Sequence, residues 1–555
     1  MIAKIRKFSS GMIFNVILIA TFFIFSSKLA NSQICGPNPD FIFQTPSQLG
    51  YINWKQFPEF TLPFKVIYGG GPQFSDYQTM LKRGYTHFSN PNYLWLLPVK
   101  NRAYIYYGVA FPGNNQPWET QKNPWGNDLQ VYKNHWDWNL GKMRSDTQSP
   151  DKIETDMLVF DIERQIKSND SILLLKTSST IPADIKALSD QNFILAYKKE
   201  LQNRYAEAMR YATKELSANT SIISSYTDSP ILNTFINIQG NSWEEWKTEI
   251  AETNYLTFDF ANNKIGGEVY NLQTHMTPSA YFYYDYPHIF APEYLSYLLF
   301  QCEANRAWTD KELILFVWLK YSYNKDFIHK PIKPWMAEAC GIFPFFGGAK
   351  GIWLWEQTGI LTEKEDLSNY EYFTKGLYRV SQYKQMFEGN YQLVEAISAR
   401  DYNENKLPIW RGVYKDGKML VAAQNPHAKS ADDVVTLKMN YNNFSKEISL
   451  KGYEIYMCMY DVNLATATEK EPETLQVYPN PSEGLINLSL SNLESGNLEI
   501  SIKTVDGKTM YSENQQIKVK ELEKTIYLEK NQNSQLLIVE ILNNTKRQTK
   551  KLILK

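Results

Sequence analysis

The chain has 555 residues, 58 basic and 59 acidic side chains, a net charge of −1 and a pI near 6.6. This charge balance excludes a whole-molecule field that would gather nucleic acid or an anionic membrane, and the length exceeds the roughly 250–300 residues at which a single core stops growing. With 43% hydrophobic and 21% charged residues, the chain is not disordered. Aromatic residues make up 14%, which indicates either a large, strand-rich core or a groove lined with rings for a flat ligand such as a sugar.

The first 32 residues have the pattern of a secretory signal peptide. Three basic residues precede an apolar run over residues 12–25, and small residues at 30–32 fit a cleavage site that leaves Gln33 as the mature N-terminus. The apolar run is shorter than the roughly 20 residues that span a membrane. We therefore predict export with passage through the periplasm, and no transmembrane segment in the mature protein.

Cysteine and histidine are sparse in this chain. The four cysteines are too few for a disulfide scaffold, and no CxxC or HExxH motif accompanies the six histidines. Cys302 and Cys340 either pair, if their helices meet, or are two buried thiols. The sequence predicts no metal site and no cofactor.

Residues 34–397 alternate between strand-like and helix-like stretches. Helices are predicted at 192–218, where apolar residues recur at helical spacing, and at 334–346 and 370–387. Strands that alternate with helices favour a parallel sheet, and eight such units predict a (β/α)8 TIM barrel with long insertions. The strand-like pair 256–260 and 269–272 is then a hairpin insertion. The eight predicted strands are residues 64–69, 85–88, 103–110, 157–163, 221–226, 280–286, 313–320 and 351–356.

The fourth predicted strand ends in two carboxylates. Chemistry in such barrels takes place where the strands end, and this strand ends Phe160-Asp161-Ile162-Glu163. By strand alternation, Asp161 and Glu163 point to the same face. Two carboxylates at such a short distance repel each other, so one of them takes up a proton near neutrality, as a general acid requires.

Two other strands also end in polar and aromatic residues. The sixth strand ends Tyr283-Tyr284-Asp285-Tyr286, and the eighth ends Trp353-Leu354-Trp355-Glu356. Because the carboxyl ends of barrel strands meet at one face, we predict that these side chains converge with the two carboxylates of the fourth strand.

These strand ends resemble the family 18 chitinase-type glycoside hydrolase barrels, whose fourth strand carries D-x-x-D-x-D-x-E. Residues 156–163 read DMLVFDIE and keep the first Asp, the last Asp and the Glu, whereas Val159 replaces the middle Asp. The Y-D-Y of the family matches residues 284–286, and its G-x-x-x-W-E matches residues 351–356. The S-x-G-G of its third strand is absent. The resemblance covers these short motifs and not the whole chain.

The resemblance implies a mechanism. Glu163 would protonate the glycosidic oxygen, and Asp161 would tune the pKa of Glu163 and steady a neighbouring charge. The nucleophile would be the N-acetyl group of the substrate, oriented by Asp161 and by the Tyr284 hydroxyl. Trp355 would form the floor of the subsite in which the sugar ring distorts.

A substrate without an acetamido group requires a second carboxylate, and Asp285 and Glu356 are the candidates. The distance between this second carboxylate and the acid would then decide the stereochemical outcome. A distance of about 5–5.5 Å indicates retention of the anomeric configuration, and about 6.5–9.5 Å indicates its inversion. Trp353 and Tyr286 are predicted to bind substrate beside these groups.

A tryptophan-rich stretch follows the third predicted strand. Trp118, Trp125, Trp136 and Trp138 alternate there with amides, carboxylates and one histidine. Rings stack on apolar sugar faces and polar side chains bond hydroxyls, so the stretch is either a sugar-binding loop or a loop that buried Trp side chains pin to the barrel. We take Trp125 and Trp136 as candidate substrate-binding residues.

Two small all-β segments follow the barrel. Residues 398–464 contain strand-like runs between turn signals and predict a β-sandwich accessory domain, and residues 465–473 predict a linker. From residue 474 onwards Trp is absent, and a hairpin turn is predicted at Asp506-Gly507. A second sandwich is predicted from alternating runs at 485–490, 498–503, 525–528, 535–542 and 550–554.

Residues 474–555 resemble the C-terminal sorting domain of type IX secretion substrates in Bacteroidetes. The residues that carry this resemblance are YPNP at 478–481, Gly484, DGK at 506–508 and KLILK at 551–555. The Gly-x-Tyr that is usual near the penultimate strand is replaced by residues 535–538, which read QLLI. The resemblance implies recognition by the type IX machinery, passage across the outer membrane, and removal of the domain.

We therefore predict a secreted or surface-attached glycoside hydrolase that acts on a poly- or oligosaccharide and is exported by type IX secretion. The alternative is a catalytically inactive barrel that binds carbohydrate on the cell surface, and the loss of the middle Asp at Val159 favours it. No G-x-S-x-G, HExxH or Cys–His signature supports a peptidase. The predicted partners are a carbohydrate and the secretion machinery, without nucleic acid.

Overall fold

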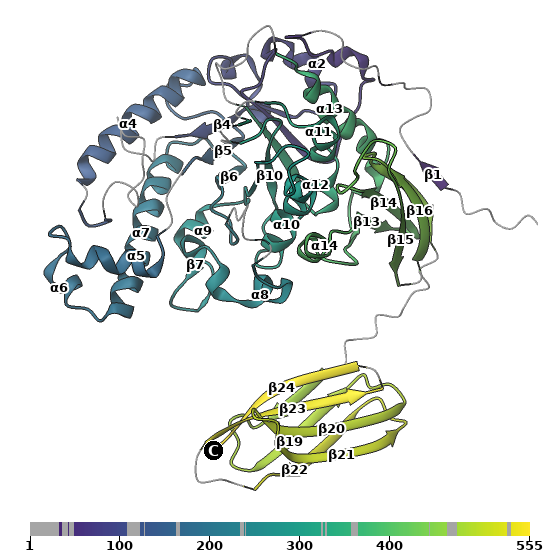
Figure 1. The fold of residues 1–555 in the computed structure, drawn as a ribbon. Helices are drawn as coiled ribbons and strands as arrows, with labels where there is room; N and C mark the ends of the chain where they lie inside the picture. The colour runs from purple at the N-terminus through teal and green to yellow at the C-terminus, as the bar shows by residue number, and fades with distance from the viewer. Residues whose placement is uncertain are drawn as a thin grey trace, which may run out of the picture. The chain divides into compact units, whose positions relative to one another are not determined.

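The chain divides into two compact units, residues 1–462 and residues 463–555 (Figure 1). The predicted signal peptide, residue 163 and the predicted linker 465–473 lie outside the residues that the structure describes. The structure is a computed structural model that describes residues 33–35, 43, 49–107, 123–126, 128–162, 167–232, 238, 240–322, 326–327, 330–356, 365–442, 444–462, 474–529, 534–544 and 546–555.

Parallel strands form the centre of the first unit. Within the described ranges they make a five-stranded sheet in the order β3-β2-β11-β10-β9 and a three-stranded sheet in the order β4-β5-β6. Each of the eight predicted strands overlaps one of them. They are β2 (Lys65–Gly69), β3 (His87–Ser89), β4 (Ala103–Tyr106), β5 (Met157–Phe160), β6 (Ile222–Ser225), β9 (Ser279–Ala280), β10 (Ile314–Trp318) and β11 (Gly351–Trp355).

Isolated parallel bridges link the edges of these two sheets. Phe88 in β3 bridges to Arg102, the residue before β4, and Tyr226, the residue after β6, bridges to Thr277 just before β9. The strands therefore follow one another in chain order across both junctions.

Alternate residues of the parallel strands share a buried core. A β-strand directs every second side chain to the same face, which explains why these residues recur two apart. On β5, for example, Met157 and Val159 point into this core, and the next residue of that series is Asp161. The core consists of Ile67, Ala103, Met157, Val159, Ile222, Ile314, Phe316 and Trp353, with Ile105, Tyr226, Tyr281 and Trp355 packed against it.

Helices alternate with the parallel strands along the chain (Figure 1). Helix α10 contacts β9, and helix α12 contacts β11. The long predicted helix is α7, and the Ser189 side chain caps its start by accepting the backbone N–H of Asn192. In the described residues the helices are α2 (Tyr77–Leu81), α4 (Leu129–Asp146), α5 (Asn169–Leu174), α6 (Ala183–Lys186), α7 (Asp190–Thr213), α8 (Trp243–Thr248), α9 (Glu268–Leu272), α10 (Tyr294–Arg306), α11 (Pro334–Cys340), α12 (Phe343–Phe346), α13 (Ser368–Ser381) and α14 (Ala399–Asn405).

Three predictions about these segments need correction. The hairpin insertion is β7 (Phe258–Asp259) with β8 (Lys264–Ile265), whereas the second stretch predicted for it belongs to helix α9. Its apolar residues Val269 and Leu272 are three apart, which places them on one face of a helix but on opposite faces of a strand. The predicted helix 334–346 is divided into α11 and α12, and the tryptophan-rich loop contains helix α4.

An antiparallel sheet completes the first unit. Its order is β1-β17-β14-β13-β12, from β1 (Gln33–Cys35), β12 (Gln392–Val394), β13 (Ile409–Lys415), β14 (Lys418–Gln424) and β17 (Tyr456–Asp461). Strands β1 and β12 come from outside the predicted accessory range 398–464. The hairpin of β15 (Val434–Tyr441) and β16 (Phe444–Lys451) lies between β14 and β17 in the chain.

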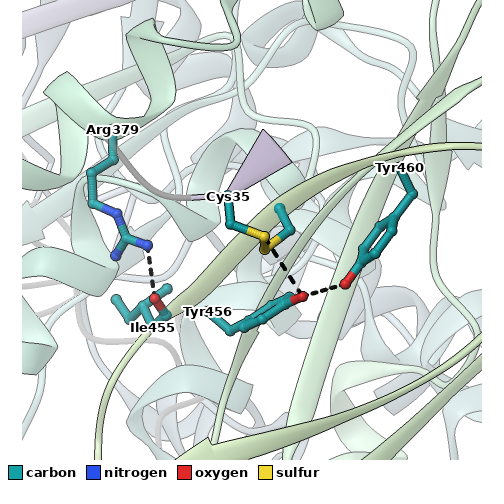
Figure 2. Close-up of a disulfide and its surroundings, with 6 residues drawn as sticks. Cys35, Arg379, Ile455, Tyr456 and Tyr460 are labelled. Carbon is teal, nitrogen blue, oxygen red and sulfur yellow. Dashed lines mark hydrogen bonds between the residues drawn. A yellow bond between two sulfur atoms is a disulfide. The ribbon is translucent and has the colours of Figure 1, made fainter. Parts of the chain in front are cut away.

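A disulfide joins Cys35 of β1 to Cys458 of β17 (Figure 2). The two residues are direct partners in the antiparallel pair of strands. Cys302 and Cys340 are free, buried thiols, which is the second of the two alternatives considered for them. The bridge therefore fixes the outermost strand of the sheet and not the helical layer.

The second unit has two antiparallel sheets in a sandwich-like arrangement, β18-β19-β22 and β21-β20-β23-β24. Leucine, isoleucine and valine side chains from both sheets form one buried core. The five predicted runs coincide with strands of these sheets, and the predicted turn at Asp506-Gly507 connects β20 to β21. The strands are β18 (Thr474–Tyr478), β19 (Leu485–Ser491), β20 (Gly496–Thr504), β21 (Thr509–Ile517), β22 (Leu522–Tyr527), β23 (Gln535–Asn543) and β24 (Lys546–Leu554).

His427, just after β14, gives the first unit a predicted pH dependence. Burial, and secondarily the charge of Lys406, lowers the pKa of this imidazole from 6.5 to about 4. The stability that neutral His427 provides is therefore present above pH 6.5 and is lost as the pH falls towards 4. We expect the free energy of unfolding, measured in urea, to fall across this window and to fall less in His427→Gln. An equal fall in both proteins would contradict this role of His427.

Candidate functional site

Polar and aromatic side chains gather at the carboxyl ends of the parallel strands. We call five of them the strand-end cluster: Asp161, Tyr226, Tyr281, Trp318 and Trp355. Each residue lies at or just after the end of its strand. Each continues the series of every second residue of that strand that faces the buried core. This placement puts one carboxylate, two phenols and two indoles at the same end of the sheets.

Ring contacts hold the strand-end cluster together. Tyr281 lies in the centre, with its ring centroid 6.1 Å from that of Tyr226, 5.8 Å from that of Trp355 and 5.9 Å from that of Trp318. Trp318 and Trp355 meet edge to face at 4.7 Å. Aromatic pairs at such distances add about 0.5–1.5 kcal/mol each beyond burial. The rings therefore form a stable surface before any ligand binds.

The Asp161 carboxylate is close enough to act on the central tyrosine. Burial raises the pKa of Tyr281 well above its usual value, and Tyr226, Asp161 and Tyr107 raise it further. The backbone N–H of Asp161 donates to the carbonyl of Tyr106 at 2.9 Å, which continues the pairing of β4 with β5 and fixes the carboxylate at the strand end. At neutral pH Tyr281 is thus a hydroxyl donor beside a carboxylate.

Glu356 was predicted as a possible second carboxylate, but it is buried behind the cluster. Its oxygens accept from the Trp318 indole N–H at 3.1 Å and from the Tyr370 hydroxyl at 2.7 Å, and the Lys320 ammonium lies 3.5 Å away. The side chains of Glu356 and Lys320 are only 1% and 4% exposed. Glu356 therefore orients Trp318 and is closed to a glycan.

Asp285 is also enclosed by partners. It accepts from the Tyr321 hydroxyl at 2.7 Å and pairs with Lys330 at 2.5 Å and Lys333 at 3.4 Å. Burial by itself would raise the pKa of Asp285, but the hydrogen bonds from Lys330 and Tyr321 and the charges of both lysines bring it below the usual value. The side chain is 2% exposed, so Asp285 is a structural anion.

The sixth strand ends earlier than we predicted, which changes the surroundings of its tyrosines. Strand β9 ends at Ala280, so residues 283–286 lie beyond the sheet. Tyr284 stacks on His288 at 4.1 Å. Tyr286 donates to the carbonyl of Pro426 at 2.7 Å and packs on Trp335. Tyr281, and not Tyr284, is the tyrosine of this strand that faces Asp161.

The other predicted substrate-binding rings lie outside the strand-end cluster. Trp353 is fully buried in the core below it and stacks on Phe316 at 4.9 Å. Trp125 is half-buried against α7, 6.1 Å from the ring of Tyr197. Trp136 is fully buried in α4 and packs on Tyr211, because α4 buries one side chain per turn at this face. Of the five rings predicted to bind substrate, only Trp355 belongs to the cluster.

Sequence reasoning missed Tyr226, Tyr281 and Trp318. The available signal was the strand pleat: counting in twos from the buried residues Ile222, Ser279 and Ile314 leads to these three positions. No group of three or more His, Cys, Asp or Glu that could hold a metal occurs in the part of the chain that the structure describes.

In the second unit, the YPNP motif binds the end of the chain. The Asn480 side chain donates to the carbonyl of Lys551 at 2.8 Å and accepts from the backbone N–H of Ile553 at 3.0 Å. Ser482 pairs through its backbone with Ile553 and Lys555, at 2.8 Å each. The first and last motifs of the predicted sorting domain thus form one structural element.

Comparisons with known proteins identify the second unit. Residues 476–555 match the family model described as the Secretion system C-terminal sorting domain. This domain interacts with the type IX machinery and directs export to the cell surface or the medium, as the sequence motifs predicted. In the described residues, no helix is both long enough and apolar enough to cross a membrane.

No curated protein matches the chain. Among solved structures, it is similar to bee venom hyaluronidase, with 16% identity, 56% of this chain and 98% of that chain covered, and a TM-score of 0.34. A putative α-galactosidase from Bacteroides fragilis has 9% identity, coverages of 72% and 79%, and a TM-score of 0.37. An endo-β-1,4-mannanase from Thermotoga petrophila has 12% identity, coverages of 77% and 78%, and a TM-score of 0.30. These TM-scores are too low to place the first unit in a family.

Proposed function

We propose that the protein is a secreted glycoside hydrolase whose active site is the strand-end cluster together with Glu163. The observation that carries the proposal is the half-buried Asp161 carboxylate beside the ring surface of Tyr281 and Trp355. Sugar rings bind aromatic faces, carboxylates and phenols form hydrogen bonds with sugar hydroxyls, and carboxyl groups catalyse hydrolysis of the glycosidic bond.

We also propose that the parallel strands close into a (β/α)8 barrel. The bridges from Phe88 to Arg102 and from Tyr226 to Thr277 support this closure, because they join the two sheets at both pairs of edges. In such a barrel, catalytic residues lie at the carboxyl ends of the strands, where the cluster lies.

In the proposed reaction, Glu163 donates its proton to the glycosidic oxygen. Glu163 follows Asp161 by two residues in the sequence, and we propose that both carboxyl groups act at the cluster. The negative charge of Asp161 keeps the proton on Glu163 until it is transferred. Trp355 supports the sugar ring, and the Tyr281 hydroxyl donates to the substrate.

The burial of the other two candidate carboxylates affects which group can act as the nucleophile. Asp285 and Glu356 are enclosed by lysines and tyrosines, so neither is placed to attack a sugar. We infer that the substrate supplies its own nucleophile, the acetamido oxygen of an N-acetylhexosamine. Asp161 and Tyr281 then orient this group.

Reducing-end release from a panel of glycans tests the proposed function. We expect the wild-type protein to cleave chitin oligosaccharides or hyaluronan, which contain N-acetylhexosamine, and to leave mannan, xylan and cellulose intact. Cleavage of the second group alone would contradict substrate assistance. Binding of the first group without cleavage would instead support the inactive, carbohydrate-binding alternative.

A further inference from the structure

A groove lies in the first unit, between helices α11 and α13 and the segment that joins β16 to β17. Its larger part is a pocket of about 520 Å³, and a smaller pocket of about 210 Å³ adjoins it beside the disulfide. The two pockets share Arg379, Lys451, Glu454 and Ile455, which makes them one elongated groove. The volume of the larger part is in the usual range for ligand sites, about 300–1,000 Å³.

One end of the groove is aromatic. Trp335 and Tyr453 stack face to face, with centroids 4.1 Å apart, and both rings are half-buried. The edge of Tyr286 supports them from 5.6 Å and 5.3 Å. The Tyr453 hydroxyl donates to the carbonyl of Ala428 at 2.6 Å, so the rings are fixed before a ligand arrives.

The walls of the groove carry charges of both signs. Glu338 accepts from Lys375 at 2.8 Å and from Arg379 at 2.6 Å. Arg379 also donates to the carbonyl of Ile455 at 2.8 Å and so ties α13 to the opposite wall (Figure 2). At the rim, Lys451 and Glu454 are exposed. This near balance suits hydroxyl groups better than a polyanion.

Beside the disulfide, strand β17 does not offer a free edge to an extended peptide. Strand β1 already pairs with β17 along that edge, and the Cys35–Cys458 bridge fixes it there (Figure 2). The walls of the groove offer a ligand aromatic rings and charged side chains that can form hydrogen bonds.

We propose that this groove is a second glycan-binding site, which takes a segment of an uncharged, linear oligosaccharide. A sugar ring stacks at the aromatic end near Trp335, and the hydroxyls of the following sugars bond Lys451 and Glu454 along the rim. The elongated shape matches a chain of sugars better than one compact metabolite. The choice of ligand class rests on the proposed function, whereas no residue that lines the groove belongs to the strand-end cluster.

Calorimetric titration of the full chain with cellohexaose, mannohexaose and chitohexaose tests the site, using the Glu163→Gln protein to limit cleavage. We expect at least one hexasaccharide to bind in the groove. Adding Trp335→Ala should weaken this binding by about tenfold or more. A second variant, Lys451→Ala with Glu454→Ala, changes only exposed side chains and should weaken the same binding event. Trp95→Ala, which removes a tryptophan that is 45% exposed elsewhere, is the matched control and should leave it unchanged.

Unchanged binding in both groove variants, or no binding of any of the three hexasaccharides, would overturn the proposal. The result is independent of turnover. Loss of binding in Trp335→Ala together with no hydrolysis of any glycan by the wild type would refute the proposed enzyme and leave the groove site standing. Glycan hydrolysis by the wild type, together with normal binding by the groove variants, would refute the groove site and leave the proposed enzyme standing.

Discussion

Glu163→Gln will lower the rate of glycan hydrolysis by about 10²–10⁴-fold, the usual contribution of a positioned general acid. The substitution keeps the size of the side chain and removes only its proton donor. The measurement is the initial rate of reducing-end release from the best glycan of the panel. Glu249→Gln, at an exposed position at the end of α8, is the matched control and should retain full activity.

The neighbouring carboxylate gives this prediction a second readout. In Asp161→Asn, the negative charge that holds the proton on Glu163 is lost, so the alkaline limb of the rate–pH profile should move to lower pH. Wild-type activity in the Glu163→Gln protein would contradict the role of Glu163 as the general acid. An unmoved alkaline limb in Asp161→Asn would remove Asp161 from its tuning role.

The second large effect concerns the ion pair of Glu303 in α10 with Arg411 in β13. Arg411 donates to one oxygen of Glu303 from two nitrogens, at 2.8 Å and 2.6 Å, while the backbone N–H of Ala399 donates to the other oxygen at 2.8 Å. The side chains are 1% and 0% exposed. Glu303→Ala leaves a buried guanidinium without its anion, and we expect it to lower the free energy of unfolding by about 3–5 kcal/mol.

Urea unfolding followed by tryptophan fluorescence isolates this effect, because every tryptophan lies in the first unit. Arg210→Ala, which breaks the exposed pair with Glu268, is the control and should cost less than about 1 kcal/mol. The double variant Glu303→Met with Arg411→Met should recover much of the loss, since no buried charge remains. A loss below 1 kcal/mol in Glu303→Ala would contradict the proposed importance of the pair.

The positions of the parallel strands could be predicted because each is a short apolar run between turn signals. The same pattern predicted Asp161, because every second residue of β5 faces inward and Asp161 is the next one after Met157 and Val159. Where a strand stops is harder to predict. Strand β9 pairs with β10 only through Ser279 and Ala280, and the residue series 283–286 gives no local sign of that early end.

The partners of the remaining carboxylates are distant in sequence and could not be predicted. Asp285 meets Lys330 45 residues further along the chain, and Glu356 meets the Trp318 indole 38 residues earlier. Cys35 and Cys458 are 423 residues apart and are brought together by the register of β1 on β17. These contacts decide which carboxylates are open to a ligand, and they follow from the packing of elements and not from motif spacing.

A crystal structure of Glu163→Gln with the glycan that the wild type cleaves tests the central claim most directly. The account predicts a sugar ring against Trp355, its acetamido group next to Asp161 and Tyr281, and the glycosidic oxygen within about 3 Å of residue 163. A glycan that binds away from these residues, while the carboxyl ends of the strands stay open to solvent, would contradict it.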